Sequence, residues 1–357
     1  MSFRVAHVGA WGRNFGDRAI QWGVQQALGV DDWVIYPYDC QRVAHYDADQ
    51  ARALTESVDV ILVGGGGLLW DKPELRSVSG WQWQVTMEFL EALRVPVVVW
   101  GVGWTAFPTD DDRTGQAPAF RETLSWLVEN AAAFTARNPQ TRAMLDLHGV
   151  EVERVDVAAD PALGAPWNRW RGGGGVLALC WASDKPAWRW DDPDDERRAL
   201  HAVVTAAKEL GLTLRLVPHL AGTDERVRGY LRDEGVNFQD VERDAPHLYP
   251  ATLERVEEWA RLSYVDADVV VSMRKHGMLI PAGMGAPVLG LGELPEVEYL
   301  AQMLGVQVVR AGDTQEQVTR RIRQAKPVEE GEVAWARMCN GALADTLAGI
   351  AMGRWTR

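Results

Sequence analysis

Arg274 and His276 are the residues of this sequence whose types and spacing best fit a chemical role. They stand two positions apart, directly after the apolar run 269–271, and Gly277 follows them. A guanidinium binds carboxylate or phosphate through two parallel N–H bonds, and an imidazole exchanges protons near neutral pH. The glycine allows a ligand to approach the backbone. A solvated basic loop is the alternative, but the position after a buried strand favours an anion-binding site that also handles a proton.

A second pair of candidates follows a strand-like run at the start of the chain. Residues 3–8 are predicted to form a strand, which leads into a glycine-rich loop that contains Asn14 and Asp17. An amphipathic helix is predicted over about 18–28. Both polar residues can cap the start of that helix, and capping is the alternative to a role for Asp17 as the acceptor of a hydroxyl proton.

A run of four glycines follows another apolar segment. Residues 58–63 are predicted to be a central strand, and Gly65, Gly66 and Gly67 belong to the glycine run after it. We expect this run to be a loop that admits a ligand, since it has almost no side-chain bulk. A helix is predicted beyond it, over about 80–93.

The candidate residues must be positioned by the ends of parallel strands. Residues 269–271 are predicted to be a strand, 278–283 a short helix and 288–291 a second strand. In open parallel sheets, ligands bind beyond the carboxyl ends of the strands. His219 directly follows another predicted strand, 213–217, so it either lines the same site or is an ordinary turn histidine.

Strands and helices alternate along the whole chain, which predicts an α/β protein with two Rossmann-like domains facing a cleft. The first domain is expected over 1–165. A segment rich in turn formers, 164–175, is the best linker, and the second domain is expected over 172–335. The final helix, within 336–357, is expected to return to the first domain.

Length and composition narrow the class of protein. The 357 residues exceed one ordinary core, and the net charge of −13 argues against non-specific binding of nucleic acid. Cys40, Cys180 and Cys339 lie far apart without metal-ligand spacing, which is typical of a reducing compartment. No apolar run reaches the roughly 18 residues of a membrane span, and there is no signal-peptide pattern. We therefore expect a cytoplasmic enzyme.

The sequence resembles the polysaccharide pyruvyl transferases, a family whose two-domain architecture is similar to that of B-type glycosyltransferases. The segments that carry the likeness, in the family's order, are NFGD at 14–17, GGGG at 64–67, GVG at 101–103, TARN at 135–138, ADP at 159–161 and MRKHG at 273–277. The glycine run and the R-x-H-G segment are the most specific of them.

The resemblance implies transfer of a pyruvyl group from phosphoenolpyruvate to two sugar hydroxyls, which gives a cyclic ketal and inorganic phosphate. His276 is then expected to deliver a proton to C3 of the donor. Arg274 and Arg137 are expected to bind its carboxylate and phosphate. Asp17 or Asp160 is expected to take the proton of the acceptor hydroxyl.

The same resemblance makes the first domain the acceptor side and the second the donor side. The glycine run would hold the acceptor sugar or the phosphate through backbone N–H groups. This chemistry demands no metal and no cofactor beyond the donor substrate. The expected partners are a small-molecule donor and a carbohydrate-containing acceptor.

Two cations that members of the family often carry are missing from this chain. The strand predicted over 176–181 lacks an arginine after it, and Glu296 stands at about the position of a frequent lysine. Lys185, Arg189 or Lys275 would have to replace them.

These departures leave other classes of protein open. With 17 tryptophans available for stacking on a base, a B-type glycosyltransferase with a nucleotide-sugar donor is the main alternative. A carbohydrate-binding protein without turnover is a further one. A nicotinamide-dependent oxidoreductase is disfavoured, because no G-x-G-x-x-G fingerprint follows the first predicted strand.

Overall fold

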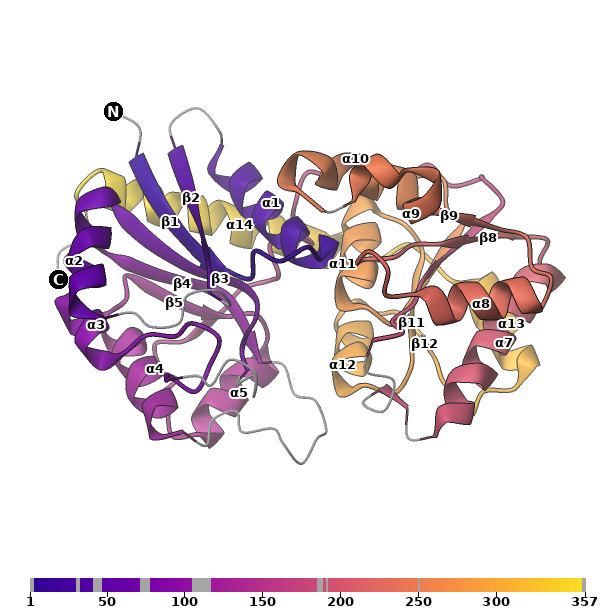
Figure 1. Cartoon of the computed structure of the whole chain (residues 1–357), viewed down its shortest axis with the longest axis horizontal. Helices are drawn as coiled ribbons and strands as arrows, with labels where there is room; N and C mark the ends of the chain where they lie inside the picture. Colours follow the sequence, from indigo (N-terminus) through magenta and orange to yellow (C-terminus); the bar gives the residue numbers. More distant parts are fainter. Residues whose placement is uncertain are drawn as a thin grey trace. The chain divides into compact units, whose positions relative to one another are not determined.

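The computed structural model describes residues 3–29, 33–40, 47–70, 78–104, 117–184, 189–190, 192–249 and 251–354. The chain forms two compact units, each with its own six-stranded sheet (Figure 1). The first unit comprises Met1–Gly12, Gly23–Ala165 and Ala336–Arg357, and the second comprises Arg13–Trp22 and Pro166–Trp335. Each unit is therefore built from segments that are separate in the sequence.

The sheet of the first unit is parallel, in the order β2-β1-β3-β4-β5-β6. Its strands are β1 Phe3–Gly9, β2 Trp33–Asp39, β3 Val60–Leu69, β4 Val97–Trp104, β5 Ala133–Ala136 and β6 Asp156–Val157. The chain order reverses between β1 and β3, which pair directly. This switch point is where a doubly wound sheet opens a crevice at its carboxyl edge.

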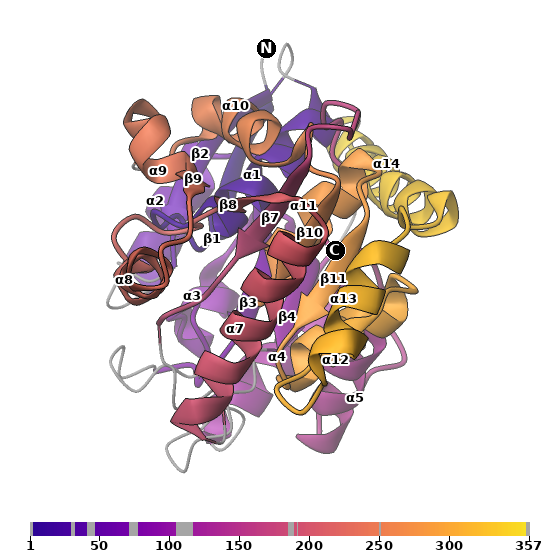
Figure 2. The same cartoon turned by 90° about the vertical axis from the view of Figure 1, so that its right-hand side faces the viewer.

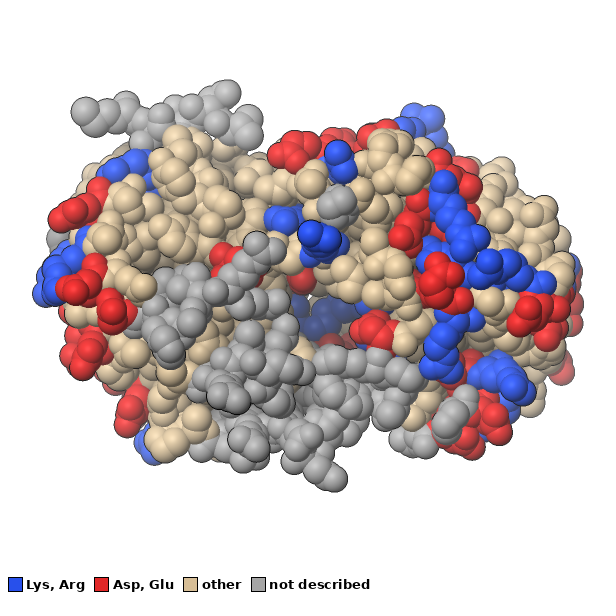
Figure 3. All heavy atoms as spheres, viewed as in Figure 1, with Lys and Arg blue, Asp and Glu red and all other residues tan. Residues whose placement is uncertain are grey.

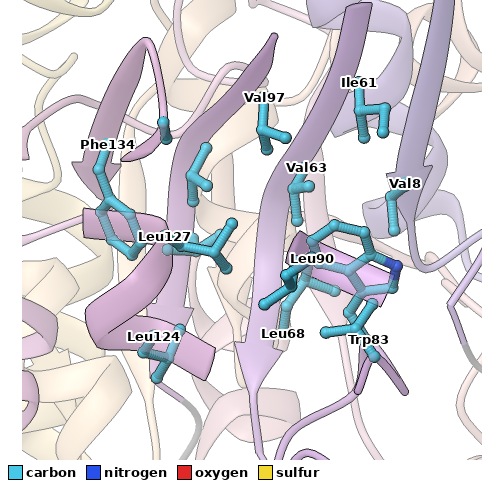
Figure 4. Packing of buried hydrophobic residues seen from close by; sticks show 14 of the residues in the cluster. Val8, Ile61, Val63, Leu68, Trp83, Leu90, Val97, Leu124, Leu127 and Phe134 are labelled. Carbon is cyan, nitrogen blue, oxygen red and sulfur yellow. The ribbon is translucent and has the colours of Figure 1, made fainter. Parts of the chain in front are cut away.

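Alternate residues of these strands pack into two cores, one on each face of the sheet. On one face, Val8, Ile61 and Val63 point toward Trp83 and Leu90 (Figure 4). The helices on that face are α2 Ala48–Ser57, α3 Met87–Ala92, α4 Pro118–Asn130 and α5 Pro139–Leu147.

The opposite face of the first sheet is covered by parts of two helices. Val24 of α1 (Phe15–Leu28) and Leu343 and Leu347 of α14 (Glu330–Ala351) pack there with Val5 and Leu62. Each of these helices runs from one unit into the other, since the first residues of α1 and of α14 belong to the second unit.

The four-glycine run is not a loop, which corrects the prediction from sequence. Gly65, Gly66 and Gly67 all lie inside β3, which continues to Leu69. Gly64 has a φ of 133°, and a Cβ atom there would overlap the carbonyl oxygen of Trp100 on the neighbouring β4. The missing side chain is therefore required by the close approach of two strands.

The helix predicted over 80–93 is also wrong in extent, because α3 begins only at Met87. Thr86 caps it, with its side chain accepting a hydrogen bond from the Phe89 backbone N–H. Before the cap, Gly80 adopts a φ of 75°, and Trp81 is fully buried. This segment fills the core with aromatic rings instead of extending the helix.

The sheet of the second unit is parallel as well, in the order β12-β11-β10-β7-β8-β9. Its strands are β7 Val176–Cys180, β8 Thr213–Leu216, β9 Phe238–Asp240, β10 Val269–Ser272, β11 Val288–Leu291 and β12 Val308–Val309. This is the classical Rossmann order, with the switch point between β7 and β10.

Helices cover both faces of the second sheet. They are α7 Pro193–Glu209, α8 Glu225–Asp233, α9 Val241–Asp244, α10 Leu253–Tyr264, α11 Lys275–Met284, α12 Pro295–Met303 and α13 Gln315–Gln324. On one face, α7 and α13 lie side by side (Figure 2), and Thr319 donates a hydrogen bond to Glu209 at 2.6 Å.

Charges of both signs are mixed on the surface of the second unit near α8 and α9 (Figure 3). Arg232 and Arg243 both lie within ion-pair distance of Glu225. Beneath them, the buried Arg228 donates to both carboxylate oxygens of Asp240. The charges of this region thus serve internal pairing.

Candidate functional site

The strongest candidate site lies at the switch point of the second sheet. The residues that follow β7 and β10 come together there, since these strands are direct neighbours and Ser272 is level with Cys180. Arg274 lies two residues beyond the end of β10 and is the N-cap of α11. The segment predicted as a turn is therefore the first turn of a helix that begins at Lys275.

The guanidinium of Arg274 is fixed by the loop after β7. Its Nε donates to the carbonyl oxygen of Trp181 at 2.8 Å, and its Nη2 donates to Asp184 at 2.6 Å. A second carboxylate, Asp224, lies 3.9 Å from Nη2. The cation is held rigidly in an acidic surrounding.

Asp184 is shared between two arginines. Arg189 donates to its carboxylate at 3.2 Å and so lies next to Arg274. Burial raises the pKa of Asp184, but the charges of Arg274 and Arg189 outweigh burial and leave this pKa below its ordinary value. Asp224 behaves in the opposite way, because it is fully buried and burial raises the pKa of its carboxyl despite Arg274.

His276 lies in the first turn of α11 and is half-buried. The glycine after it was expected to admit a ligand, but its place is taken up by packing. A Cβ atom on Gly277 would overlap Ser272 Oγ and come within 2.8 Å of Cys180 Cβ. Gly277 therefore lets α11 rest on β10 and β7, which fixes the height of His276 above the sheet.

The NFGD segment at 14–17 belongs to the second unit and lies against His276. Asn14 accepts a hydrogen bond from the Gly16 backbone N–H at 2.7 Å and so caps α1. Asp17 follows in the first turn of that helix and is half-exposed. The structure thus brings Asn14 and Asp17 into the same unit as Arg274 and His276.

His219, which we expected either to line the site or to be an ordinary turn histidine, is a buried core side chain. Only 1% of it is exposed, and its Nε2 lies 3.0 Å from the Tyr264 hydroxyl. Burial, with smaller contributions from Arg274 and His276, places the pKa of its imidazole well below the ordinary value. Its carbonyl oxygen accepts a hydrogen bond from the Phe15 N–H at 2.8 Å, so it supports the NFGD segment.

The remaining predicted residues lie in the first unit. Arg137 follows β5, and its Nη1 lies 3.5 Å from Asp160, while Asp160 also accepts from the Ala162 N–H at 3.0 Å. Both side chains are buried. The guanidinium lies against Gly103, and no described residue accepts a hydrogen bond from its Nη2. Arg137 and Asp160, predicted to serve donor and acceptor separately, are partners of each other.

One buried titratable residue was not singled out in the sequence. His7 of β1 is fully buried, and its Nε2 lies 2.8 Å from the carbonyl oxygen of Gly64, across the switch point of the first sheet. Burial lowers the pKa of His7 to about 4. A histidine at an apolar strand position was the signal available.

The structure also places the charges that depart from the family pattern. Glu296 pairs with Lys275 at 3.1 Å, so the two charges compensate each other. Arg189 lies beside Arg274, as described above. Lys185 lies outside the described residues.

The two parallel six-stranded sheets with their helices define a two-domain α/β protein with the architecture of B-type glycosyltransferases. Similar solved structures include UDP-GlcNAc 2-epimerase from Methanocaldococcus jannaschii, with a TM-score of 0.54 at 9% identity over 97% of this chain and 99% of that one. The enzyme from Neisseria meningitidis bound to UDP-GlcNAc has a TM-score of 0.53 at 11% identity, over 98% and 100%. HepE from Anabaena in complex with UDP has a TM-score of 0.51 at 11% identity, over 99% and 98%.

Residues 14–294 match the family model of polysaccharide pyruvyl transferases, and the chain belongs to that family. The resemblance predicted from the motifs is confirmed by this match. A search of curated proteins finds no match. Within the described part of the chain, no helix is long and apolar enough to cross a membrane.

Proposed function

We propose that the protein transfers the pyruvyl group of phosphoenolpyruvate to two hydroxyls of a sugar and releases inorganic phosphate. The observation that carries this proposal is the position of His276 beside Arg274 in the first turn of α11, at the switch point of the second sheet. An anion and a proton can be handled there together.

The chemistry requires a proton donor at one carbon of the donor substrate. Protonation of C3 turns the methylene into a methyl group and makes C2 electrophilic, so that the first sugar hydroxyl adds to C2. The C2–O bond to phosphate then breaks, and the second hydroxyl adds to the same carbon to close the ketal. One hydroxyl proton balances the proton delivered to C3, and the other leaves with the phosphate. His276 is half-buried and suits the delivery step.

Arg274 suits the donor's negative charge. Its Nε and Nη2 are held by Trp181 and Asp184, and among the described residues none accepts a hydrogen bond from its Nη1. That nitrogen, together with the N-terminus of α11, would face a carboxylate or phosphate. Arg189 would add positive charge through the shared Asp184.

Asp17 suits the removal of the acceptor proton better than Asp160. It is half-exposed and lies in the first turn of α1, within the same unit as His276. Asp160 is buried, and its carboxylate is occupied by Arg137 and the Ala162 N–H.

A nucleotide sugar is the second candidate donor, and one observation favours it. Arg274 and Lys275 each already pair with a carboxylate, Asp184 and Glu296 respectively. Phosphoenolpyruvate concentrates a carboxylate and a phosphate on one carbon, and these would compete with both acids. Neighbours of the same fold bind UDP or UDP-GlcNAc, which adds to this candidate.

The experiment that separates these donors is thermal unfolding with each ligand alone. A ligand at 100 times its dissociation constant stabilises the folded state by about 2.7 kcal/mol. We expect phosphoenolpyruvate to raise Tm and UDP-, GDP- and TDP-sugars to leave it unchanged. Incubation with phosphoenolpyruvate and candidate sugars should then yield a new methyl singlet in the proton NMR spectrum, with equimolar phosphate. Stabilisation by a nucleotide sugar alone would replace the proposal with glycosyl transfer.

A further inference from the structure

The imidazole of His276 lies directly against the backbone of Gly16. A Cβ atom built on Gly16 would overlap Nδ1 of that ring, come within 2.8 Å of its Cγ and lie 3.0 Å from Asn14 Oδ1. Both residues belong to the second unit. Gly16 is buried in the first turn of α1, and its Cα packs directly against the ring.

The backbone at Gly16 is fixed by hydrogen bonds and by the packing of its neighbour. The Gly16 N–H donates to Asn14 Oδ1 at 2.7 Å, and the Arg18 N–H donates to the Asn14 carbonyl at 3.1 Å. Next to it, Phe15 is fully buried and stacks on Trp259 with ring centroids 4.2 Å apart. The backbone at position 16 therefore cannot retreat without disturbing a helix cap and an aromatic stack.

The helix that carries His276 is closely packed as well. A Cβ atom on Gly277 would overlap Ser272 Oγ, so α11 lies directly against the end of β10. The ring is thus fixed between α11, which carries it, and the first turn of α1.

We propose that Gly16 is a positioning residue for His276. Its backbone sets the rotamer of the imidazole, and a side chain at position 16 would turn the ring away from the donor. The catalytic part of this inference rests on the proposed function of His276. The contact itself can be tested separately.

The kinetic test is Gly16→Ala. The φ of Gly16 is one that alanine adopts, so backbone strain is not introduced. Misplacing a reacting group by about 1 Å lowers rate on the order of 100-fold. We expect kcat to fall by about that factor, with KM for phosphoenolpyruvate changed less than about twofold. Gly229→Ala is the matched control, because Gly229 lies in helix α8 of the same unit and has open space around its Cα. It should leave kcat unchanged.

The test that does not depend on activity is a double-mutant cycle read as Tm. Gly16→Ala should lower Tm in the wild-type background, because the methyl group meets the ring. In the His276→Ala background the same change should lower Tm less, because the overlap with the ring is gone and only the close contact with Asn14 Oδ1 remains. Equal changes in Tm in the two backgrounds would overturn the inference.

If Gly16→Ala alone fails to fold, recovery of folding in the double variant supports the same contact, and failure of both contradicts it. If the changes in Tm differ between the two backgrounds but His276→Ala transfers the pyruvyl group as fast as the wild type, the contact is supported and His276 has no catalytic role. The two proposals therefore fail in different ways.

Discussion

At His276, chemistry and stability can be separated by one substitution. The side chain is half-buried in the first turn of α11, so its removal takes little from the core. We expect His276→Ala to lower pyruvyl transfer by about 100-fold or more, the typical loss of a general acid. Tm should stay within a few degrees of the wild type. Ketal formation by NMR and thermal unfolding check the two parts, and retained turnover would contradict the role of His276 as the acid.

The role of Arg274 requires a planar guanidinium, because two of its nitrogens donate hydrogen bonds to different partners at the same time. A lysine has all its donors on one nitrogen, so it cannot reproduce the planar arrangement in which Nε and Nη2 separately bind the Trp181 carbonyl and Asp184. We expect Arg274→Lys to raise KM for phosphoenolpyruvate about tenfold or more, equivalent to roughly 1.5 kcal/mol for one charged hydrogen bond. Arg232→Lys is the control, since its pair with Glu225 is exposed at 3.7 Å. An unchanged KM would make Arg274 purely structural.

His7 makes the stability of the first unit depend on pH. Burial lowers its folded pKa to about 4, from an ordinary value of 6.5. The unfolded chain therefore binds a proton at higher pH than the folded one. The contribution of neutral His7 to the free energy of unfolding is complete above pH 6.5, and it is lost as pH falls toward 4. This loss amounts to roughly 3 kcal/mol.

The measurement is Tm of the wild type and of His7→Gln at several values of pH between 7 and 5. Glutamine keeps a donor for the Gly64 carbonyl but does not titrate. The variant should start less stable and lose less on acidification. Parallel curves for the two proteins would show that His7 does not carry this pH dependence, since the buried His219 is present in both.

At the scale of elements, strand β3 depends on its glycines for pairing. We expect Gly64→Ala to destabilise the protein by about 2 to 4 kcal/mol, from backbone strain at its φ of 133° and overlap with the Trp100 carbonyl. Gly341→Ala in α14 is the control, because nothing lies near its Cα. Chemical denaturation gives both values. A neutral Gly64→Ala would mean that β3 and β4 can separate at this point.

The same strand shows where prediction from sequence succeeded and failed. Apolar runs placed β1, β7, β10 and β11 nearly to the residue, because buried parallel strands need continuous hydrophobic segments. The prediction of a loop at the glycine run was wrong. Glycine is typical of loops, but here it is required because the neighbouring strand β4 lies too close for a side chain. The start of α11 was missed as well, because Arg274 provides no side-chain cap.

The candidate site was predicted in part for a similar reason. Local order along the chain placed Arg274 and His276 after a strand. The partner of Arg274 is Asp184, 90 residues away, and no local pattern indicates that pair. The contact between Gly16 and His276 joins residues that are still further apart in the sequence. Contacts of this range arise from the topology, which sequence patterns fix only in outline.

At the scale of the whole molecule, units and sequence halves do not coincide. Phe15 lies near the start of the chain but is core to the second unit, between Tyr249 and Trp259. We expect Phe15→Ala to destabilise this unit by about 3 to 5 kcal/mol. In hydrogen exchange, protection should fall first in α10, which carries Trp259, and remain in β1. Loss of protection confined to β1 would contradict this assignment.

Because α14 is the last helix to be synthesised, the core of the first unit cannot be completed until the end of translation. Strands β1, β3 and β4 leave the ribosome long before Leu343 and Leu347, which cover one face of their sheet. The 170 residues of 166–335 are made in between. At about 5 to 20 residues per second this takes roughly 10 to 30 s. During that interval Val5, Leu62 and Val98 lack the part of their cover that α14 supplies, so apolar surface of the nascent first unit stays exposed while the second unit is made.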